Sequence, residues 1–243
     1  MLEVRDIKKS FGGIEALQGS VFTVEGGRTT AFIGPNGAGK TTLFDIISGF
    51  LKPDSGSVFF DHKDITALSP HERAKLGISR SFQQVRLFKY LSIFEHLRMV
   101  EDHEDSRLLK NICFKQNTDH THAYEKILID FGIERDPNTT VEELSYGQKK
   151  LLQILLALRM KHRLVLLDEP VAGVNKVIQD RIESLLLDLK KKGETILLID
   201  HDMEFIRNLA DHVIVLDAGV VLTQGKPNQV LTDKKVLEAY LGQ

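Results

Sequence analysis

The sequence predicts an α/β fold, in which buried parallel strands alternate with helices. Short runs rich in Val, Ile and Leu, each bounded by Gly, Pro, Asp or charged residues, are typical of strands buried on both faces of a parallel sheet. A helical pattern between the second and third run completes a strand–helix–strand unit. The runs are Thr29 to Ile33, Leu164 to Leu167, Thr195 to Ile199 and Val213 to Leu216.

The helix of that unit begins near Val177, and its apolar side chains follow helical spacing as far as Leu189. Lys190 to Lys192 suit its C-terminal end, because positive charges there interact favourably with the helix dipole. Gly193 is then expected to end the helix.

The middle of the chain, from about residue 85 to residue 161, lacks clear strand runs. Helical patterns lie around 93–100, 123–131 and 147–160. We therefore predict a helical subdomain at 85–161, inserted into a core of residues 1–84 and 162–243 whose N-terminal part is rich in β-structure. Residues 105–118 fit no period and are predicted to form an exposed loop.

The composition limits the kind of protein. A formal net charge of -2 gives no reason to expect a nucleic-acid partner, which usually requires a basic excess. The single cysteine, Cys113, excludes an internal disulfide and favours a reducing compartment, so the cytoplasm is expected. No run approaches the roughly 18 apolar residues that cross a bilayer, and the start of the chain lacks the apolar core of a signal peptide. Work at a membrane would therefore depend on other subunits.

A glycine-rich segment that follows the first run fits the phosphate-loop pattern G-x-x-x-x-G-K-[ST] and precedes an apolar helical start. Its glycines allow backbone N–H groups to turn toward phosphate oxygens, and the following helix adds the positive end of its dipole. Lys40 would reach the β- and γ-phosphates, and the Thr41 hydroxyl would bind Mg²⁺. The core is thus predicted to be of the phosphate-loop NTPase (RecA-like) type, with ATP and Mg²⁺ as cofactors. The binding residues would be Gly34, Asn36, Gly37, Ala38, Gly39, Lys40, Thr41 and Thr42.

Two adjacent acids end the apolar run at 164–167. In phosphate-loop ATPases an Asp at this place holds the Mg²⁺ shell, so Asp168 is the candidate. Glu169, one residue later, would polarise the attacking water. The alternative is that the pair only caps a helix that begins after the strand.

The segment Leu144-Ser145-Tyr146-Gly147-Gln148, here called the signature segment, lies about 20 residues before Asp168. Ser145 and Gln148 have the spacing of a capping box, which by itself predicts only the start of a helix. The segment also resembles LSGGQ, the signature of the ATP-binding cassette (ABC) family, with Tyr146 in place of the first glycine. Together with the order of the other motifs, this resemblance extends over essentially the whole chain.

The resemblance implies roles for three more residues. Phe11 stands where the family stacks adenine, Gln83 where a glutamine binds near Mg²⁺ and links the γ-phosphate to membrane subunits, and His201 where a histidine contacts the γ-phosphate. Taken alone, Phe11 fits a core residue, Gln83 a solvated loop residue and His201 a residue at a helix start. Gln84 adjoins Gln83, so the resemblance identifies the loop that carries this role more firmly than it identifies which of the two glutamines has it.

The resemblance also implies a head-to-tail dimer of two ATPase subunits around two ATP molecules. The signature segment of one subunit, through Ser145, Gly147 and Gln148, would close over the γ-phosphate held by Lys40 of the other. His201 would help Glu169 position the water. The loop at 172–175 stands where the family links the two sites, although Asn175 replaces the commonest residue, Asp.

Finer similarity, in the runs at 81–88, 144–148, 171–175 and 200–203, is to bacterial branched-chain amino acid importers and their amide and urea relatives. It implies integral membrane permease subunits as partners, a second ATPase subunit that is a copy or a paralogue, and indirectly a substrate-binding protein. The protein would then lie peripherally on the cytoplasmic face of the inner membrane. The apolar loop at 85–88 is the expected seat for a permease helix, with packing inside the subdomain as the alternative.

Two other functions stay open. One is an exporter motor, including lipid or lipopolysaccharide transport, against which Tyr146 and the 172–175 loop argue. The other is an ABC ATPase of translation or DNA repair, but such proteins usually fuse two cassettes or insert a coiled coil or zinc module, which this sequence does not.

Overall fold

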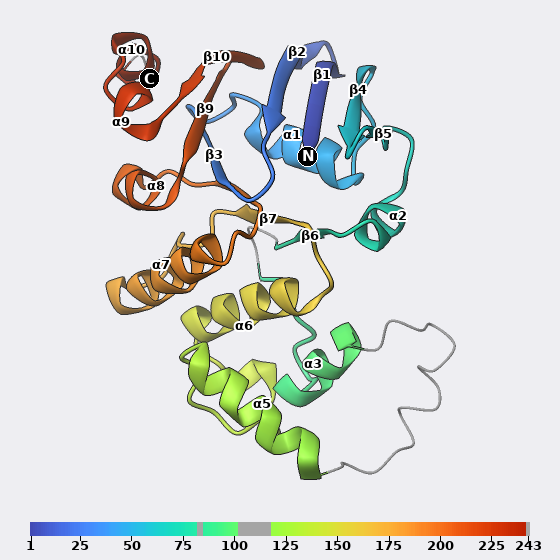
Figure 1. The fold of residues 1–243 in the computed structure, drawn as a ribbon, viewed down its shortest axis with the longest axis vertical. Helices are drawn as coiled ribbons and strands as arrows, with labels where there is room; N and C mark the ends of the chain where they lie inside the picture. The colour runs from blue at the N-terminus through green and yellow to red at the C-terminus, as the bar shows by residue number, and fades with distance from the viewer. Residues whose placement is uncertain (82–84, 102–117, 242–243) are drawn as a thin grey trace.

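The computed structural model describes residues 1–81, 85–101 and 118–241. Within them the chain forms two β-sheets with helices packed around them (Figure 1). The antiparallel sheet has the order β2-β1-β4-β5 and is built from the N-terminal part of the chain. Its strands are β1 (Leu2–Phe11), β2 (Ile14–Val24), β4 (Ser55–Phe60) and β5 (Lys63–Asp64).

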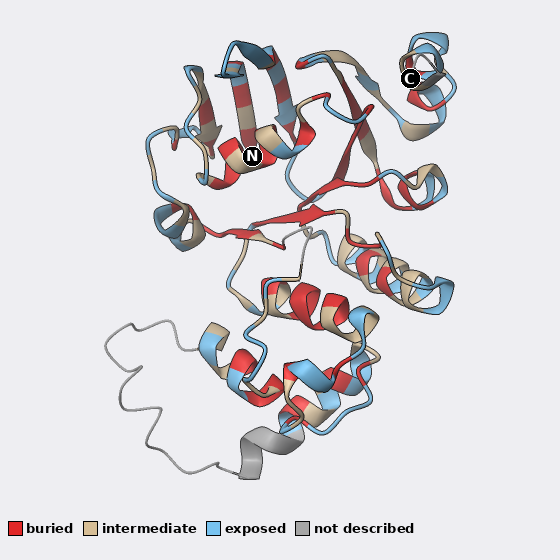
Figure 2. Cartoon of the chain, turned by 180° about the vertical axis from the view of Figure 1, so that it is seen from behind, coloured by how far each residue is buried: buried red, intermediate tan, exposed pale blue. Residues whose placement is uncertain are grey.

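The second sheet has the order β10-β9-β3-β8-β7-β6, and its strands are parallel except for the edge strand β10. The four predicted runs are its strands β3, β7, β8 and β9. Burial differs between the sheets as expected: the four strands are buried along nearly their whole length, whereas β1 and β2 alternate between buried and exposed residues (Figure 2). The strands are β3 (Thr29–Ile33), β6 (Ile78–Arg80), β7 (Leu164–Asp168), β8 (Ile196–Ile199), β9 (His212–Asp217) and β10 (Val220–Gly225).

Within the described residues, six helices accompany the two sheets. The helix predicted between the second and third runs is α7, and it ends before Gly193, which has φ 77°. Its N-cap is Asn175, whose side-chain oxygen accepts a hydrogen bond from Ile178 N–H at 3.0 Å. The helices are α1 (Lys40–Ser48), α2 (Pro70–Lys75), α7 (Lys176–Lys191), α8 (Met203–Leu209), α9 (Pro227–Val230) and α10 (Lys234–Leu241).

The helical patterns of the middle of the chain correspond to α3 (Ile93–Glu101), α5 (Thr118–Asp130) and α6 (Tyr146–Arg159), with a short 3₁₀ turn at Val141–Glu143. These helices lie together at the end of the molecule away from the antiparallel sheet (Figure 1). Of the loop predicted at 105–118, residues 105–117 lie outside the described residues, and Thr118 begins α5. The mixed α/β fold class is confirmed, whereas the subdomain boundaries at 85 and 161 stay a prediction.

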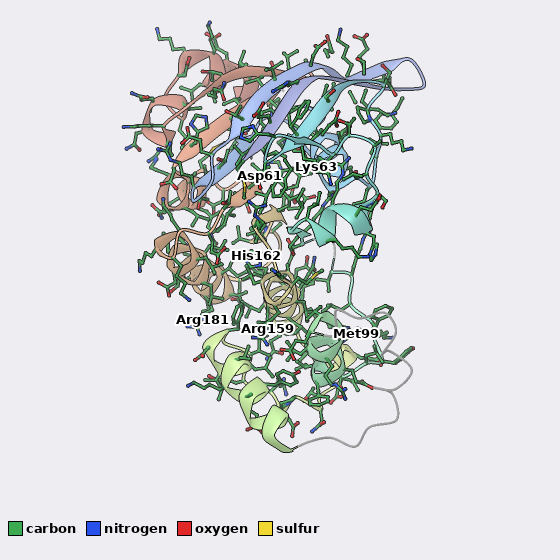
Figure 3. The ribbon with its side chains drawn as sticks, turned by 45° about the vertical axis from the view of Figure 1, so that its right-hand side comes forward. Asp61, Lys63, Met99, Arg159, His162 and Arg181 are labelled. Carbon is green, nitrogen blue, oxygen red and sulfur yellow. The ribbon has the colours of Figure 1, made fainter. Side chains whose placement is uncertain are left out.

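Arginines join these helices to one another and to the core, and two of them, Arg159 and Arg181, are labelled in Figure 3. Arg159 of α6 pairs with Glu101 of α3, and Arg181 of α7 donates to the carbonyl of Asp130 at the end of α5. Arg163, just before β7, pairs with Asp61 beside β4 and so connects the two sheets. None of the helices in the described ranges, which leave out 82–84, 102–117 and 242–243, combines the length and the apolar character needed to cross a membrane.

Candidate functional site

The predicted phosphate loop joins β3 to α1 at the carboxyl end of the parallel strands, where open α/β sheets bind ligands. Gly34 has φ 146°, and a Cβ at that position would lie 2.0 Å from the carbonyl oxygen of Leu216 in β9. Gly39 has φ 97°, and its Cβ would lie 2.5 Å from the carbonyl oxygen of Ala16. The close approach of neighbouring backbone therefore requires glycine at both ends of the loop.

Lys40 is the first residue of α1 and is only 7% exposed. Its ammonium folds back over the loop and donates to the carbonyls of Gly34 at 2.6 Å and Pro35 at 2.8 Å. Burial lowers the pKa of Lys40, and the nearby carboxylates of Glu169 and Asp168 oppose this effect. The three charged groups therefore lie close enough to interact electrostatically.

The other loop residues surround the start of α1. Asn36, Gly37 and Thr41 are exposed, so their polar groups are open to a ligand at the positive end of the helix. Gly39 and Thr42 are half-buried, and Ala38 is buried, with its carbonyl accepting from Gly219 N–H at 3.2 Å. This arrangement of exposed backbone and hydroxyl groups at a helix N-terminus suits a phosphate chain.

Asp168 ends β7 and is 2% exposed. One carboxylate oxygen, Oδ2, pairs with Arg80 at 3.2 Å, while the buried Oδ1 has no hydrogen-bond partner among the described residues. Burial raises the pKa of Asp168, and Arg80 opposes it. An unpartnered buried carboxylate oxygen is costly unless a cation or a donor approaches it. Together with the exposed Thr41 hydroxyl, this oxygen fits Mg²⁺, which prefers hard oxygen ligands.

Glu169 follows with φ 47°, a left-handed conformation that is uncommon outside glycine. Its N–H donates to the carbonyl of Ile199 at 2.9 Å, which continues the pairing with β8. Its carboxylate lies 2.8 Å from Nε2 of His201, which is exposed. Non-glycine residues in such conformations cluster at active sites, because the surrounding structure must hold them there.

Asp200, which follows β8, positions His201. It is 3% exposed, and its Oδ1 accepts from the N–H groups of His201 at 2.7 Å and Asp202 at 3.0 Å. Burial raises the pKa of Asp200, and these backbone hydrogen bonds oppose the effect. Asp200 therefore fixes the turn that presents His201 to Glu169.

The signature segment begins α6 with the predicted capping box. Ser145 accepts from Gln148 N–H at 3.2 Å, and the Gln148 side chain accepts from Ser145 N–H at 3.1 Å. A Cβ on Gly147 would lie 2.9 Å from the Ile178 side chain, so the segment packs closely on α7. Its remaining face opens onto a groove of about 550 Å³, which also includes Arg135 and Asn175. The structure thus places the signature segment on an open surface of this chain.

Phe11 lies at the β1–β2 hairpin and is 48% exposed, so it is not the core residue that was the alternative. The ammonium of Lys9 lies 5.5 Å from the centre of its ring and also pairs with Asp54 at 2.6 Å. An exposed aromatic ring presents a face for stacking. Gln83, the remaining predicted site residue, and its neighbour Gln84 lie outside the described residues.

Comparison with known proteins identifies the family. A model described as "ABC transporter" matches residues 17–172. The chain belongs to the ABC transporter family. It is the ATP-binding cassette of such a transporter and hydrolyses ATP.

Relatives of the cassette match over its full length. It is 35% identical to a probable branched-chain amino acid transport ATP-binding protein, LivG, of Archaeoglobus fulgidus, covering 100% of this chain and 95% of the relative. It is 34% identical to the high-affinity branched-chain amino acid transport ATP-binding protein BraF of Pseudomonas aeruginosa, with coverage of 100% and 98%.

Solved structures agree with the fold. A nucleotide-free ATP-binding cassette from an ABC transporter superposes with a TM-score of 0.85 at 35% identity, over 100% of this chain and 99% of the other. A dimeric cassette in a post-hydrolysis state, bound to ADP and Pi, gives a TM-score of 0.79 at 25% identity, over 93% and 99%. ABC cassettes therefore form dimers, and this relative does so with ADP and Pi bound.

Three residues at the site of the cassette escape prediction from sequence. Arg80 pairs with Asp168, Lys150 of α6 donates to the carbonyl of Glu169 at 2.9 Å, and the hydroxyl of Tyr240 in α10 accepts from Gly34 N–H at 2.7 Å. Arg80 and Tyr240 lie 88 and 206 residues from their partners in sequence, whereas Lys150 lies 19 residues from Glu169. The only local signal was a lysine just before the apolar run of α6, where a charge at a buried position implies a partner.

Proposed function

We propose that this cassette is the motor subunit of a branched-chain amino acid importer. The observation that carries the proposal is the full-length similarity, at 34% and 35% identity, to two proteins named for that transport. The signature segment and the turn at 200–203 also support it, because both resemble the corresponding segments of branched-chain amino acid importers. The amide or urea importers and the lipid exporters are the alternatives.

In the proposed site, ATP lies across the phosphate loop with its adenine on Phe11. The Lys40 ammonium would exchange the carbonyls of Gly34 and Pro35 for β- and γ-phosphate oxygens, which are stronger, charged acceptors. N–H groups from Asn36 to Thr42 would donate to the phosphates at the start of α1. The groups that would bind the phosphates all lie within one strand–loop–helix unit, from β3 to α1.

Thr41 and Asp168 would hold Mg²⁺, with Gln83 predicted to contribute from a segment outside the described residues. The ion, when bound, neutralises phosphate charge. Asp168 is suited to this role because its pairing with Arg80 uses one oxygen and leaves the other unpartnered among the described residues.

Glu169 would act as the general base that orients and deprotonates the attacking water, and His201 would contact the γ-phosphate. The 2.8 Å contact between Glu169 and His201 supports a joint role, since it fixes the direction of the carboxylate.

Two cassettes would enclose two ATP molecules head to tail, with Ser145, Gly147 and Gln148 of one facing the γ-phosphate of the other. The exposed start of α6 supports this, because its free N–H groups and dipole favour an anion from another molecule. Hydrolysis would remove that anion and open the dimer. The second cassette is a copy of this chain or a paralogue.

Permease subunits would hold the cassette on the cytoplasmic face of the inner membrane, and a substrate-binding protein would deliver the cargo to them. The proposed contact surface includes the loop at 85–88, where Phe88 is 64% exposed, and the neighbouring Tyr90, which is 76% exposed. Exposed aromatic residues of this kind are enriched in protein interfaces.

The test is to tag the chain in its native host, solubilise membranes in mild detergent and identify co-purifying proteins by mass spectrometry. We expect two multi-span permeases with a cassette partner, encoded beside a periplasmic binding protein that takes up leucine, isoleucine or valine. Recovery with ribosomes or DNA-repair proteins would overturn the transport assignment. Recovery with permeases whose binding protein prefers urea or an amide would contradict only the assignment of branched-chain amino acids as the cargo.

A further inference from the structure

One backbone carbonyl, that of Glu169, joins three parts of the site. Lys150 Nζ of α6 donates to it at 2.9 Å. The N–H of Ala172, in the loop that leads to α7, donates to it at 3.2 Å. The same residue carries the proposed general base and has a left-handed backbone. The orientation of its peptide plane therefore depends on what holds this oxygen.

Lys150 is unusually well fixed for a lysine. It is 2% exposed, and several residues that follow it in α6, Leu151, Leu152 and Ile154, are buried as well. Burial lowers the pKa of Lys150, and the carboxylates of Glu169, Asp168 and Asp200 oppose this shift. A buried ammonium needs such compensation, because lysine is almost never fully buried without a partner.

The position of Lys150 along α6 connects its contact with Glu169 to the signature segment at the start of the helix. Ser145, the N-cap of α6, precedes Lys150 by five residues, which is about 7.5 Å along a helix axis. The capping box and the close contact of Gly147 with Ile178 fix the start of the helix. Because one continuous helix joins the two, with Lys149 N–H donating to the carbonyl of Ser145 at 2.9 Å, a displacement of the signature segment moves the Lys150 ammonium with it.

We infer that Lys150 is a positioning residue through which the signature helix of this chain aligns the catalytic Glu169 of the same chain. In the proposed dimer the signature segment contacts the partner's ATP, whereas Glu169 acts on the ATP of its own chain. Lys150 therefore couples closure over one ATP molecule to the alignment of the base at the other. The inference rests on the proposed role of Glu169.

The test compares ATP turnover of full-length variants. Lys150→Met removes the ammonium and keeps the apolar length of the side chain, and Ala172 N–H still satisfies the carbonyl. We expect kcat to fall by about 10- to 100-fold, as misplacement of a catalytic group does, while KM for ATP changes by less than about threefold. Lys150→Arg, which restores a cationic donor, should recover part of kcat.

Lys149→Met is the matched control, since Lys149 is the adjacent lysine on α6 and its ammonium points instead to the exposed carbonyl of Glu142 at 3.2 Å. It should leave kcat unchanged. A Lys150→Met kcat equal to that of Lys149→Met, or a loss that appears only in KM, would overturn the inference. If Lys150→Met fails to fold, Lys150→Gln, with a donor too short to reach the carbonyl, should show the same loss of kcat.

Two further variants separate this inference from the role of Glu169. Adding Lys150→Met to Glu169→Gln should leave both the residual turnover and the ATP-dependent dimer unchanged, because the base is already absent. Rapid ATP turnover by Glu169→Gln alone would contradict the proposed role of Glu169, independently of the results for the Lys150 variants. Blocked turnover in Glu169→Gln together with normal kcat in Lys150→Met would end only the inference about Lys150.

Discussion

At the residue scale, the phosphate loop depends on glycine where the backbone of another strand approaches it. We predict that Gly34→Ala lowers the free energy of unfolding by about 3 kcal/mol and abolishes ATP binding, because its Cβ would overlap the carbonyl of Leu216. Gly193→Ala is the control: its φ is also positive, but nothing lies within 4 Å, so the cost should be about 1 kcal/mol. Urea unfolding measures the free energy of unfolding of both variants. Equal losses would show that the approach of the Leu216 carbonyl to Gly34 does not matter.

His96 makes stability depend on pH. It is 2% exposed, its Nδ1 lies 2.8 Å from the carbonyl of Ser92, and its Nε2 accepts from Phe88 N–H at 3.0 Å. Both bonds hold only in the neutral ring with the proton on Nδ1. Burial lowers the pKa of His96, while the Ser92 carbonyl and Glu95 oppose the shift. The unfolded chain therefore binds the proton more readily, and stability falls as pH drops below the ordinary histidine value near 6.5 toward the lowered pKa.

Replacing this ring should flatten that dependence. We expect the free energy of unfolding of His96→Phe to change less than that of the unmodified chain between about pH 7.5 and pH 5.5. The exposed His71 supplies the control, since His71→Gln should keep the original slope. Parallel curves for all three proteins would exclude His96 as the source.

The sequence could indicate those parts of the candidate site that are formed by residues close together in the chain. The glycines of the phosphate loop, the paired acids after β7 and the capping box of Ser145 each need only a few neighbouring residues, so the sequence contains their signal. Arg80 and Tyr240 contact the site across 88 and 206 residues of sequence. No local pattern encodes such pairs, because only the packed fold brings them together.

At the element scale, Arg73 of α2 closes the end of α1, the helix that starts at the phosphate loop. It is 1% exposed and donates to the carbonyls of Ile46 at 2.6 Å and Ile47 at 2.7 Å, as well as to those of Leu68 and Thr66. A cation there meets the negative end of the helix dipole. Burial lowers its pKa to about 10, so the guanidinium stays charged at neutral pH.

Arg73→Met should lower the free energy of unfolding by about 3 kcal/mol, because it leaves buried carbonyls without a donor. Arg207→Met, at an exposed position in the last turn of α8, should cost less than about 1 kcal/mol. Chemical unfolding of the two variants gives the two free energies of unfolding to be compared. A similar loss in both would show that Arg73 contributes no more than a surface residue.

Strands and helices were predictable to different degrees. Buried strands β3, β7, β8 and β9 and helix α7 follow strong apolar patterns, and the sequence predicted them within a residue or two. Strand β6 has three residues, and β10 is a half-exposed antiparallel edge, so neither makes a continuous apolar run. Their place in the sheet comes from pairing with β7 and β9.

At the scale of the whole molecule, one cassette offers two half-sites on different surfaces. Lys40, Asp168 and Glu169 gather at the carboxyl end of the parallel sheet, whereas Ser145 and Gly147 face an open groove beside α7. This separation is the physical reason for proposing that ATP joins two cassettes.

Glu169→Gln tests this proposal most directly, with oligomeric state measured by size-exclusion chromatography and light scattering. We predict that the variant hydrolyses ATP at least ~100-fold more slowly, binds ATP and Mg²⁺, and forms a dimer in ATP but not in ADP. Adding Lys40→Ala should abolish that dimer. A Glu169→Gln protein that turns over ATP rapidly, or that stays monomeric with ATP bound, would contradict it.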